Sequence, residues 1–344
     1  MKQRNAEPFG PVIYGLFLLA LVATMLLCVC AGSVAIPLGD TLTVLWNSLW
    51  SLPMPEGVAT AIILSVRLPR VLCVALVGAS LSLCGAAMQG LLRNPLADGS
   101  TLGVSSGASL GAVIAIALGV TVPGWTFGGT MLMAMLFAFL SLVMILSLAY
   151  ALDRSLATNS IILIGVIFTM FVSSLISLII AFAGEKVKTI TFWTMGSLSG
   201  SHMAYAGLLA AALLVCGGVI LCQARELNAF AVGEDNARHV GVNVRRVKLT
   251  VMAAASALIG VCVAVGGTIG FVGLVVPHMA RMIVGPNHRR LLPASLLSGA
   301  IFLLLADLVG RTLLSPIELP IGVVTSLVGA VIFIAVFWRT RRRA

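Results

Sequence analysis

Long apolar segments separated by short polar turns run along almost the whole chain. Ten such segments can be distinguished, and a transmembrane helix takes about 20 mostly apolar residues. The segment 270–284 is shorter and contains Pro277, so it can span a bilayer only with support from its neighbours. The pattern predicts an all-α polytopic membrane protein with about ten transmembrane helices. The segments cover residues 11–32, 62–88, 100–118, 125–149, 158–182, 203–222, 247–266, 270–284, 291–311 and 320–338.

Composition agrees with a membrane protein. Of the 344 residues, 60% are hydrophobic and 9% are charged, whereas soluble domains carry roughly 25% charged residues. The net charge of +10 is distributed over short loops, which is typical of membrane topology and argues against a nucleic-acid partner. The seven cysteines lie mostly in apolar runs without CxxC spacing. We therefore expect small buried side chains, with no metal or cofactor site.

The positive residues set the orientation. The first segment is longer than the roughly 7–15 apolar residues of a signal peptide, so we treat it as an uncleaved helix. Ten spans then place both termini on one side, with sixteen of the 21 Lys and Arg residues, which makes that side cytoplasmic. The membrane lipid is the surrounding partner. The positive residues left outside are Arg67, Arg70, Lys186, Lys188 and Arg311.

The chain has no linker or low-complexity tract, so residues 1–344 are expected to form a single transmembrane domain. Two halves of five spans each would have opposite topologies, as in the inverted repeats of many transporters. The topology therefore permits an inverted repeat of five plus five helices. Internal similarity strong enough to establish such a repeat is not visible in the sequence.

Residues 223–248 are the one thoroughly polar stretch, and we call them the polar segment. Charges at a helix centre cost about 2.5–3.5 kcal/mol each, so this segment must lie outside the hydrocarbon, on the cytoplasmic side. Its internal spacing predicts two short amphipathic helices, with a glycine at the corner and another at the end. An ordinary solvated loop is the alternative. The defining positions are Leu227, Phe230, Gly233, Glu234, Asp235, Ala237, Arg238, Val240 and Gly241.

Small residues are concentrated in two of the segments. Gly103, Gly107 and Gly111 form two consecutive GxxxG steps, which allow helix backbones to approach closely. We favour tight packing over a pore-lining role for these glycines. Ser173 and Ser177, in the segment 158–182, are a weaker indication of a polar path.

Several long motifs occur in a fixed order along the chain. They are Arg67-Leu68-Pro69-Arg70, the stretch from Met88 to Asp98, the stretch from Gly233 to Val242, the stretch from Phe271 to Arg281, and the stretch from Glu318 to Thr325. Together they resemble the permease subunits of bacterial ABC importers for iron–siderophore complexes, haem and vitamin B12. The resemblance extends from about Arg67 to Phe333. It departs at Gly99, where the family often has proline, and at Gly329–Phe333, where a Gly-Ala-Pro-aromatic run is usual.

The resemblance implies a ten-helix permease in the bacterial inner membrane. Such a subunit pairs with a second copy or a close paralogue, and its translocation path runs along the interface between them. Two cytoplasmic ATPase subunits and a periplasmic binding protein complete the importer. The implied cargo is an iron–siderophore complex first, then haem, then cobalamin, because the apolar path offers no bank of metal ligands.

The resemblance also implies roles for particular residues. The polar segment corresponds to the coupling helices that rest on the ATPase. Arg67, Arg70 and Arg311 correspond to outward-facing arginines that pair with acidic residues of the binding protein. The residues themselves agree, because Arg67 and Arg70 are three apart and share a helix face, and arginine suits bidentate recognition of carboxylates.

Other functional classes find less support. The chain has no GxxxxGK[ST] motif, so ATP hydrolysis is assigned to a partner. It also lacks HExxH and a nucleophile elbow, so we do not expect an enzyme. An ion-coupled secondary transporter is the main alternative, with a structural scaffold behind it. Such a transporter usually needs a charged residue near the midplane, whereas Asp307 lies near a boundary, four residues from Arg311, and is expected to pair with it.

Overall fold

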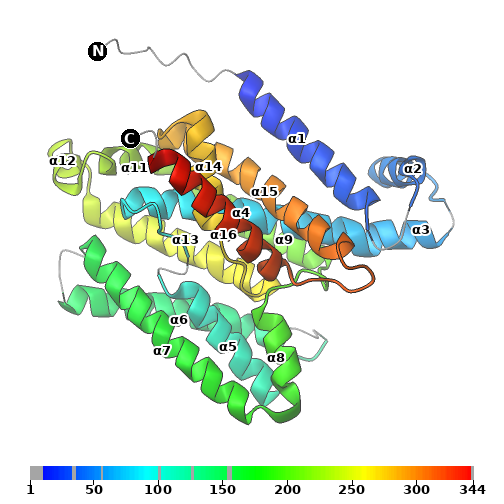
Figure 1. The fold of residues 1–344 in the computed structure, drawn as a ribbon, viewed down its shortest axis with the longest axis horizontal. Helices are drawn as coiled ribbons and strands as arrows, with labels where there is room; N and C mark the ends of the chain where they lie inside the picture. Colours follow the sequence, from blue (N-terminus) through cyan, green and yellow to red (C-terminus); the bar gives the residue numbers. More distant parts are fainter. Residues whose placement is uncertain are drawn as a thin grey trace.

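The computed structural model describes residues 11–32, 36–55, 57–99, 102–124, 128–152 and 157–341. This part of the chain folds entirely into helices and connecting turns (Figure 1), which confirms the all-α class. The helices are α1 Pro11–Cys30, α2 Leu38–Leu49, α3 Val58–Ala61, the π-helical η1 Ile62–Arg67, α4 Leu68–Leu91, α5 Val104–Leu118, α6 Gly128–Leu152, α7 Thr158–Phe182, the 3-10 turn η2 Gly184–Lys186, α8 Val187–Thr194, α9 Met203–Ala212, the π-helical η3 Leu213–Gly217, α10 Gly218–Cys222, α11 Ala224–Phe230, α12 Glu234–His239, α13 Val244–Gly266, α14 Val272–Val284, α15 His288–Thr312 and α16 Ile321–Arg341.

Each of the ten predicted apolar segments coincides with a helix or a continuous run of helices. In the described part of the chain, seven helical spans are long and apolar enough to cross a membrane, and shorter apolar helices in α5, α14 and α16 occupy the other three segments. The first residues of the segments 100–118 and 125–149 lie outside the described residues. The short helices α2 and α8 were not predicted, because they have only 12 and 8 residues, respectively, and a mixed composition.

The centre of the molecule is α4, which packs against α13, α14 and α15. Two pairs of glycines make these contacts close. A Cβ added to Gly78 would overlap the carbonyl oxygen of Gly299 in α15, and one added to Gly85 would overlap Gly273 at the start of α14. In lipid, such approaches replace the hydrophobic effect as a source of helix association, since backbones gain van der Waals contact. Most of the span Val58–Leu91 is consequently buried.

The central helix begins before the motif that contains Pro69. α3, η1 and α4 form one continuous helix from Val58, so Pro69 lies in its interior. Proline in a helix interior removes a backbone donor and crowds the preceding turn. The structure accommodates Pro69 with the π-helical turn η1, which immediately precedes α4. Arg67 and Arg70 therefore lie about 14–18 Å along the helix from Val58.

Candidate functional site

A cavity of about 430 Å³ opens between α5, α7 and the connection from α13 to α14. Its wall carries many small polar side chains. Hydroxyl groups come from Ser105, Ser106, Ser109, Ser173, Ser177, Thr194 and Thr268, and Asp98 supplies a carboxylate; the apolar part consists of Leu81, Ile176, Ile259, Ile269 and Phe271. The two serines that indicated a polar path, Ser173 and Ser177, thus lie on this wall.

Several of these hydroxyls donate their hydrogen within the wall. Ser109 donates to the carbonyl of Ser105 at 2.8 Å, and Ser177 donates to the carbonyl of Ser173 at 2.9 Å. A hydroxyl used in this way satisfies its donor inside its own helix and retains oxygen lone pairs that can accept. The described residues contain no group of three or more His, Cys, Asp or Glu side chains able to hold a metal ion. The wall is therefore weakly polar and ill-suited to bind a bare metal ion.

The glycines of the GxxxG steps lie elsewhere, between α5 and α6. A Cβ on Gly107 would lie 2.8 Å from the carbonyl oxygen of Phe137, and one on Gly111 would overlap the carbonyl of Met133. Gly103 precedes α5 with a φ of 67°, a left-handed conformation that favours glycine. Gly107 and Gly111 let α5 approach α6 closely, while Gly103 provides the left-handed turn before α5.

Non-helical backbone between α13 and α14 lines part of the cavity. Thr268 donates its hydroxyl to the carbonyl of Thr194 at the end of α8, and the amide of Ser197 donates to the carbonyl of Gly266 at 2.9 Å. Within the hydrocarbon region of a membrane protein, irregular backbone is tolerated only where it is buried in protein or lines a cavity. These two hydrogen bonds thus join the end of α8 and the residues after it to the α13–α14 connection beside the cavity.

Gln89 was not predicted as a functional residue, yet it holds the start of α14. Its amide nitrogen donates to the carbonyl oxygens of Gly273 at 3.2 Å and Leu274 at 3.1 Å, and its oxygen accepts from Arg281 at 3.1 Å. Pro277 has no N–H to bond the carbonyl four residues before it, which is that of Gly273. Gln89 therefore satisfies the backbone group that the proline leaves open.

The polar segment forms the two predicted short helices, α11 and α12, separated by a turn at Gly233. Leu227, Phe230 and Ala237 are buried against the membrane domain, whereas Val240 is exposed. Gly233 has a φ of 122° and Gly241 a φ of 86°, backbone conformations that are costly for other residues. The segment is thus anchored on one side and leaves an exposed side carrying Val240.

One carboxylate ties α12 to two spans. Glu234, the first residue of α12, accepts from the Lys248 ammonium of α13 at 2.7 Å and from the hydroxyl of Thr158 at 3.1 Å. Lys248 is fully buried, whereas the Glu234 side chain is 23% exposed. Thr158 begins α7, which carries Ser173 and Ser177 farther along. In contrast, Asp235 and Arg238 form an exposed pair at 3.5 Å.

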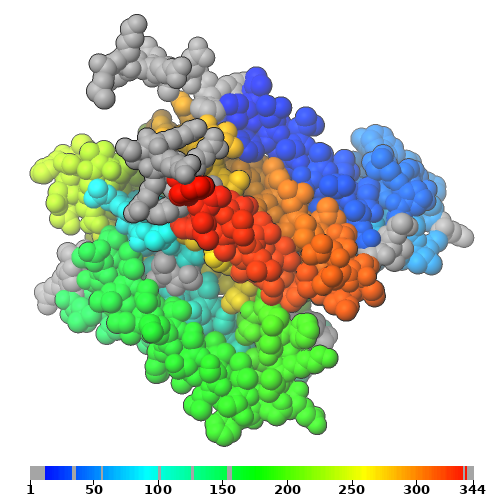
Figure 2. All heavy atoms as spheres, viewed as in Figure 1, coloured from blue at the N-terminus to red at the C-terminus, as the bar shows by residue number. Residues whose placement is uncertain are grey.

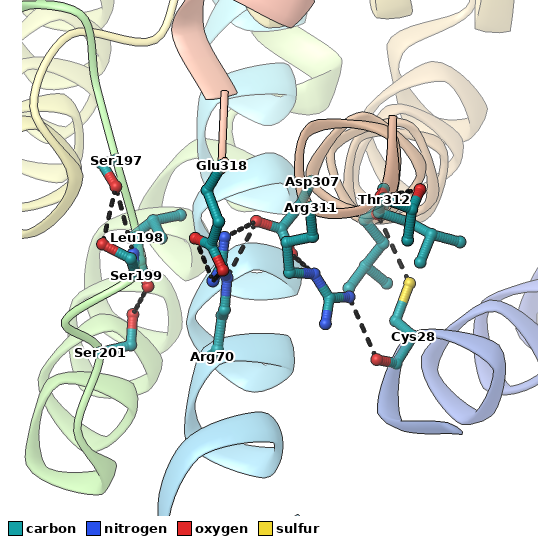
Figure 3. A network of polar contacts seen from close by, with 12 residues as sticks. Cys28, Arg70, Ser197, Leu198, Ser199, Ser201, Asp307, Arg311, Thr312 and Glu318 are labelled. Atoms are coloured by element: carbon teal, nitrogen blue, oxygen red, sulfur yellow. Dashed lines mark hydrogen bonds and ion pairs between the residues drawn. The ribbon is translucent and has the colours of Figure 1, made fainter. Parts of the chain in front are cut away.

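The outer ends of α1, α4 and α15 meet at a cluster of charged residues, which we call the arginine cluster (Figure 3). Arg70 of α4 contacts Asp307 at 2.9 Å and makes two contacts with Glu318, at 2.9 and 3.1 Å. Arg311 lies 2.9 Å from the second oxygen of Asp307, as an ion pair without hydrogen-bond alignment. This confirms the expected pairing of Asp307 with Arg311. The cluster comprises Arg67, Arg70, Asp307, Arg311 and Glu318.

Two arginines of the cluster also cap α1. Arg67 donates to the carbonyls of Val29 at 2.8 Å and Cys30 at 2.7 Å, and Arg311 donates to those of Cys28 and Ala31. The last carbonyls of a helix have no partner within it and carry partial negative charge, so cations stabilise them.

The structure thus brings the three predicted arginines together but points them inward. Arg67, Arg70 and Arg311 are only 4%, 7% and 4% exposed. Glu318, whose side chain is 39% exposed, is the part of the cluster most open to an approaching protein.

Comparison with known proteins places these features in context. The sequence pattern of the FecCD transport family matches residues 19–339. An uncharacterized ABC transporter permease, YvrB of Bacillus subtilis, is 43% identical over 94% of this chain and 92% of its own. The vitamin B12 import system permease BtuC of Klebsiella pneumoniae is 39% identical over 100% and 97%. A solved structure assigned to the metal-chelate type of ABC transporter, in an inward-facing conformation, is 33% identical, with a TM-score of 0.84 over 96% and 100%.

Proposed function

Because the chain belongs to the FecCD transport family, we propose that it is the permease subunit of an ATP-driven importer for a large, preassembled metal complex. The cavity between α5 and α7 is the observation that carries this proposal. Its wall offers hydroxyl groups and apolar side chains but few groups able to ligate a metal. Such a wall suits a cargo whose metal is already enclosed by its own ligand, since weak contacts allow the cargo to leave as readily as it enters.

Cobalamin is the first cargo to test. The sequence motifs alone had favoured iron–siderophore complexes, followed by haem and then cobalamin. We place cobalamin first instead, because a permease named for vitamin B12 import is 39% identical over the whole chain. In a corrinoid the cobalt is held by the macrocycle, so the cavity wall need not touch the metal.

The proposal includes three kinds of partner. ATPase subunits would rest on the exposed side of the polar segment, near Val240, and a second permease subunit would complete the path. A periplasmic binding protein would deliver the cargo at the outer face. There, an acidic side chain of the binding protein would displace Glu318 from Arg70, which gives the arginines a docking role despite their burial.

Reconstituted vesicles provide the test. The permease, its ATPase and its binding protein are assembled in vesicles, and uptake of labelled cobalamin, a ferric siderophore and haem is compared. We expect ATP-dependent uptake of cobalamin that persists when the proton gradient is collapsed, because the proposed importer draws its energy from ATP hydrolysis by its partner subunits. Uptake of an iron complex in place of cobalamin would show that the cargo is that iron complex. Transport driven by a pH gradient without the ATPase would replace the importer with a secondary transporter.

A further inference from the structure

The short helix α2 presents three distinct faces. Thr41 and Val44 are buried against the rest of the protein. Leu38, Leu42 and Trp46 lie exposed on a second side, together with Leu49. The remaining side is polar: Asp40, Thr43 and Asn47 follow it.

This distribution of residues indicates what surrounds each face of α2. The exposed apolar stripe repeats at the spacing of a helix face, and the polar stripe runs along the other side of the same helix. A helix that merely stands in water does not separate its exposed residues in this way. Trp46 and Trp50 are 59% and 61% exposed, and their rings pack together with centroids 5.8 Å apart. Tryptophan is enriched where a protein crosses from hydrocarbon to headgroups.

The apolar stripe is continuous with the lipid-facing surface of α1. Leu26 of α1 lines the same crevice, of about 540 Å³, as Leu42, Leu45, Trp46 and Leu49 of α2, and Thr43 and Asn47 line it as well. Exposed leucines also lie along α1, and α1 and α2 adjoin each other in Figure 2. Leu26 lies four residues before the outer end of α1 at Cys30, about 6 Å along the helix. The apolar side of α2 thus reaches below the end of a membrane span.

We propose that α2 is an interfacial helix that binds the outer leaflet of the bilayer. Its apolar stripe and the α1–α2 crevice take up lipid acyl chains, its tryptophan pair lies at the headgroup level, and its polar side faces the periplasm. Interfacial helices place their apolar face about 5–10 Å into the boundary between headgroups and chains, which agrees with the level of Leu26. The occupant is lipid rather than a second subunit, because the stripe continues the surface of α1.

Lipid bound to α2 also stabilises the part of the protein next to the arginine cluster. α2 follows α1 closely and packs against α3, the first turn of the central helix. Because Arg67 and Arg311 hold the end of α1, lipid bound by α2 steadies the same corner of the molecule. The inference does not depend on the nature of the cargo.

Tryptophan fluorescence tests the inference directly. Trp125, Trp193 and Trp338 are replaced by phenylalanine, which leaves Trp46 and Trp50 as reporters. The full chain is reconstituted on its own, so that tryptophans of a partner add no emission, in phosphatidylcholine brominated either near the headgroup or near the chain end. We expect bromines near the headgroup to reduce the emission about twofold, because the rings lie at shallow depth, and bromines near the chain end to reduce it less.

Two neighbouring substitutions supply the matched comparison. Leu42→Gln lies on the apolar stripe and is expected to weaken the quenching by shallow bromines, whereas Asp40→Asn, on the polar side and outside the crevice, is expected to leave it unchanged. Quenching by aqueous iodide instead of brominated lipid would place α2 in water and overturn the inference. Emission insensitive to both quenchers would mean that protein covers the stripe, which also overturns it.

Discussion

At the residue scale, several buried polar side chains satisfy backbone carbonyls that helices leave open. Gln89 serves the carbonyl freed by Pro277, and Arg67 and Arg311 serve those at the end of α1. In hydrocarbon an unsatisfied backbone group costs several kcal/mol, because water is not available to replace the partner. Such side chains therefore determine whether α1 and α14 can end or begin where they do.

Replacing Gln89 with methionine tests this role. The substitution keeps the length of the side chain but removes both donors to α14 and the acceptor for Arg281. We expect the free energy of unfolding to fall by about 1–3 kcal/mol, the cost of leaving a buried polar group unpaired. Thermal unfolding of the detergent-purified protein measures it. Ser174→Ala is the control, because that exposed hydroxyl bonds only within its own helix; equal melting temperatures for the two variants would contradict the role.

Glu318 gives a second prediction, about docking. Glu318→Gln weakens its hold on Arg70, because a neutral amide replaces the charge-assisted contact. If a carboxylate of the binding protein competes for Arg70, the variant should bind that protein several-fold more tightly, while Asp307→Asn should disturb folding instead, since Asp307 is buried. Surface plasmon resonance with the binding protein gives the affinity. Weaker binding by Glu318→Gln would show that Glu318 itself contacts the partner.

The sequence indicated some of these residues and not others. Pro277 alone predicts that the carbonyl of Gly273 needs a new donor, and Arg67, Arg70 and Arg311 are conspicuous outside the cytoplasmic loops. The partners could not be predicted, because Gln89 and Gly273 are 184 residues apart and meet only through the packing of α4 on α14. The inward direction of the arginines was missed for the same reason: the end of α1 that they cap comes from a distant part of the chain.

At the scale of elements, α12 is joined to α7 and α13 through Glu234. The predicted coupling role of the polar segment requires a stiff connection, and the sequence did predict both helices and the glycines that bound them. It did not reveal that Lys248 is buried beneath Glu234, because a lysine beside the polar segment resembles any cytoplasmic positive charge. The structure adds a route from α12, through Thr158, to the helix that carries Ser173 and Ser177.

Glu234→Gln tests this connection. It removes the carboxylate charge that faces the buried Lys248 ammonium, and it weakens the contact that holds α12 to α7. We expect the ATPase to remain bound, while cobalamin transported per ATP hydrolysed falls several-fold. Glu185→Gln is the matched control, the same substitution at an exposed carboxylate of η2 outside the polar segment, and should transport normally. If both variants transport like the parent, the polar segment does not transmit force through Glu234.

At the scale of the whole molecule, the proposed path would need a second wall facing the cavity. Its wall combines α5, α7 and the α13–α14 connection, and α7 also exposes large apolar side chains such as Ile167, Met170 and Phe171. Lipid or a second subunit must cover them. The hydroxyls beside them favour a subunit, because lipid chains offer nothing for a hydroxyl to bond. The family resemblance likewise implies a path between two permease subunits.

Cysteine cross-linking in native membranes distinguishes a second subunit from lipid as the neighbour of this surface. Ser177→Cys places a thiol on the cavity wall near the proposed interface, whereas Leu140→Cys places one on α6, at an exposed position outside that wall. If two copies face each other across the path, a bifunctional maleimide should join two Ser177→Cys chains into a product of twice the monomer mass. Leu140→Cys should give no more of that product than the parent chain, whose own seven cysteines set the background. Cross-linking at Leu140→Cys in place of Ser177→Cys would move the interface to α6 and leave the hydroxyl-lined cavity facing lipid.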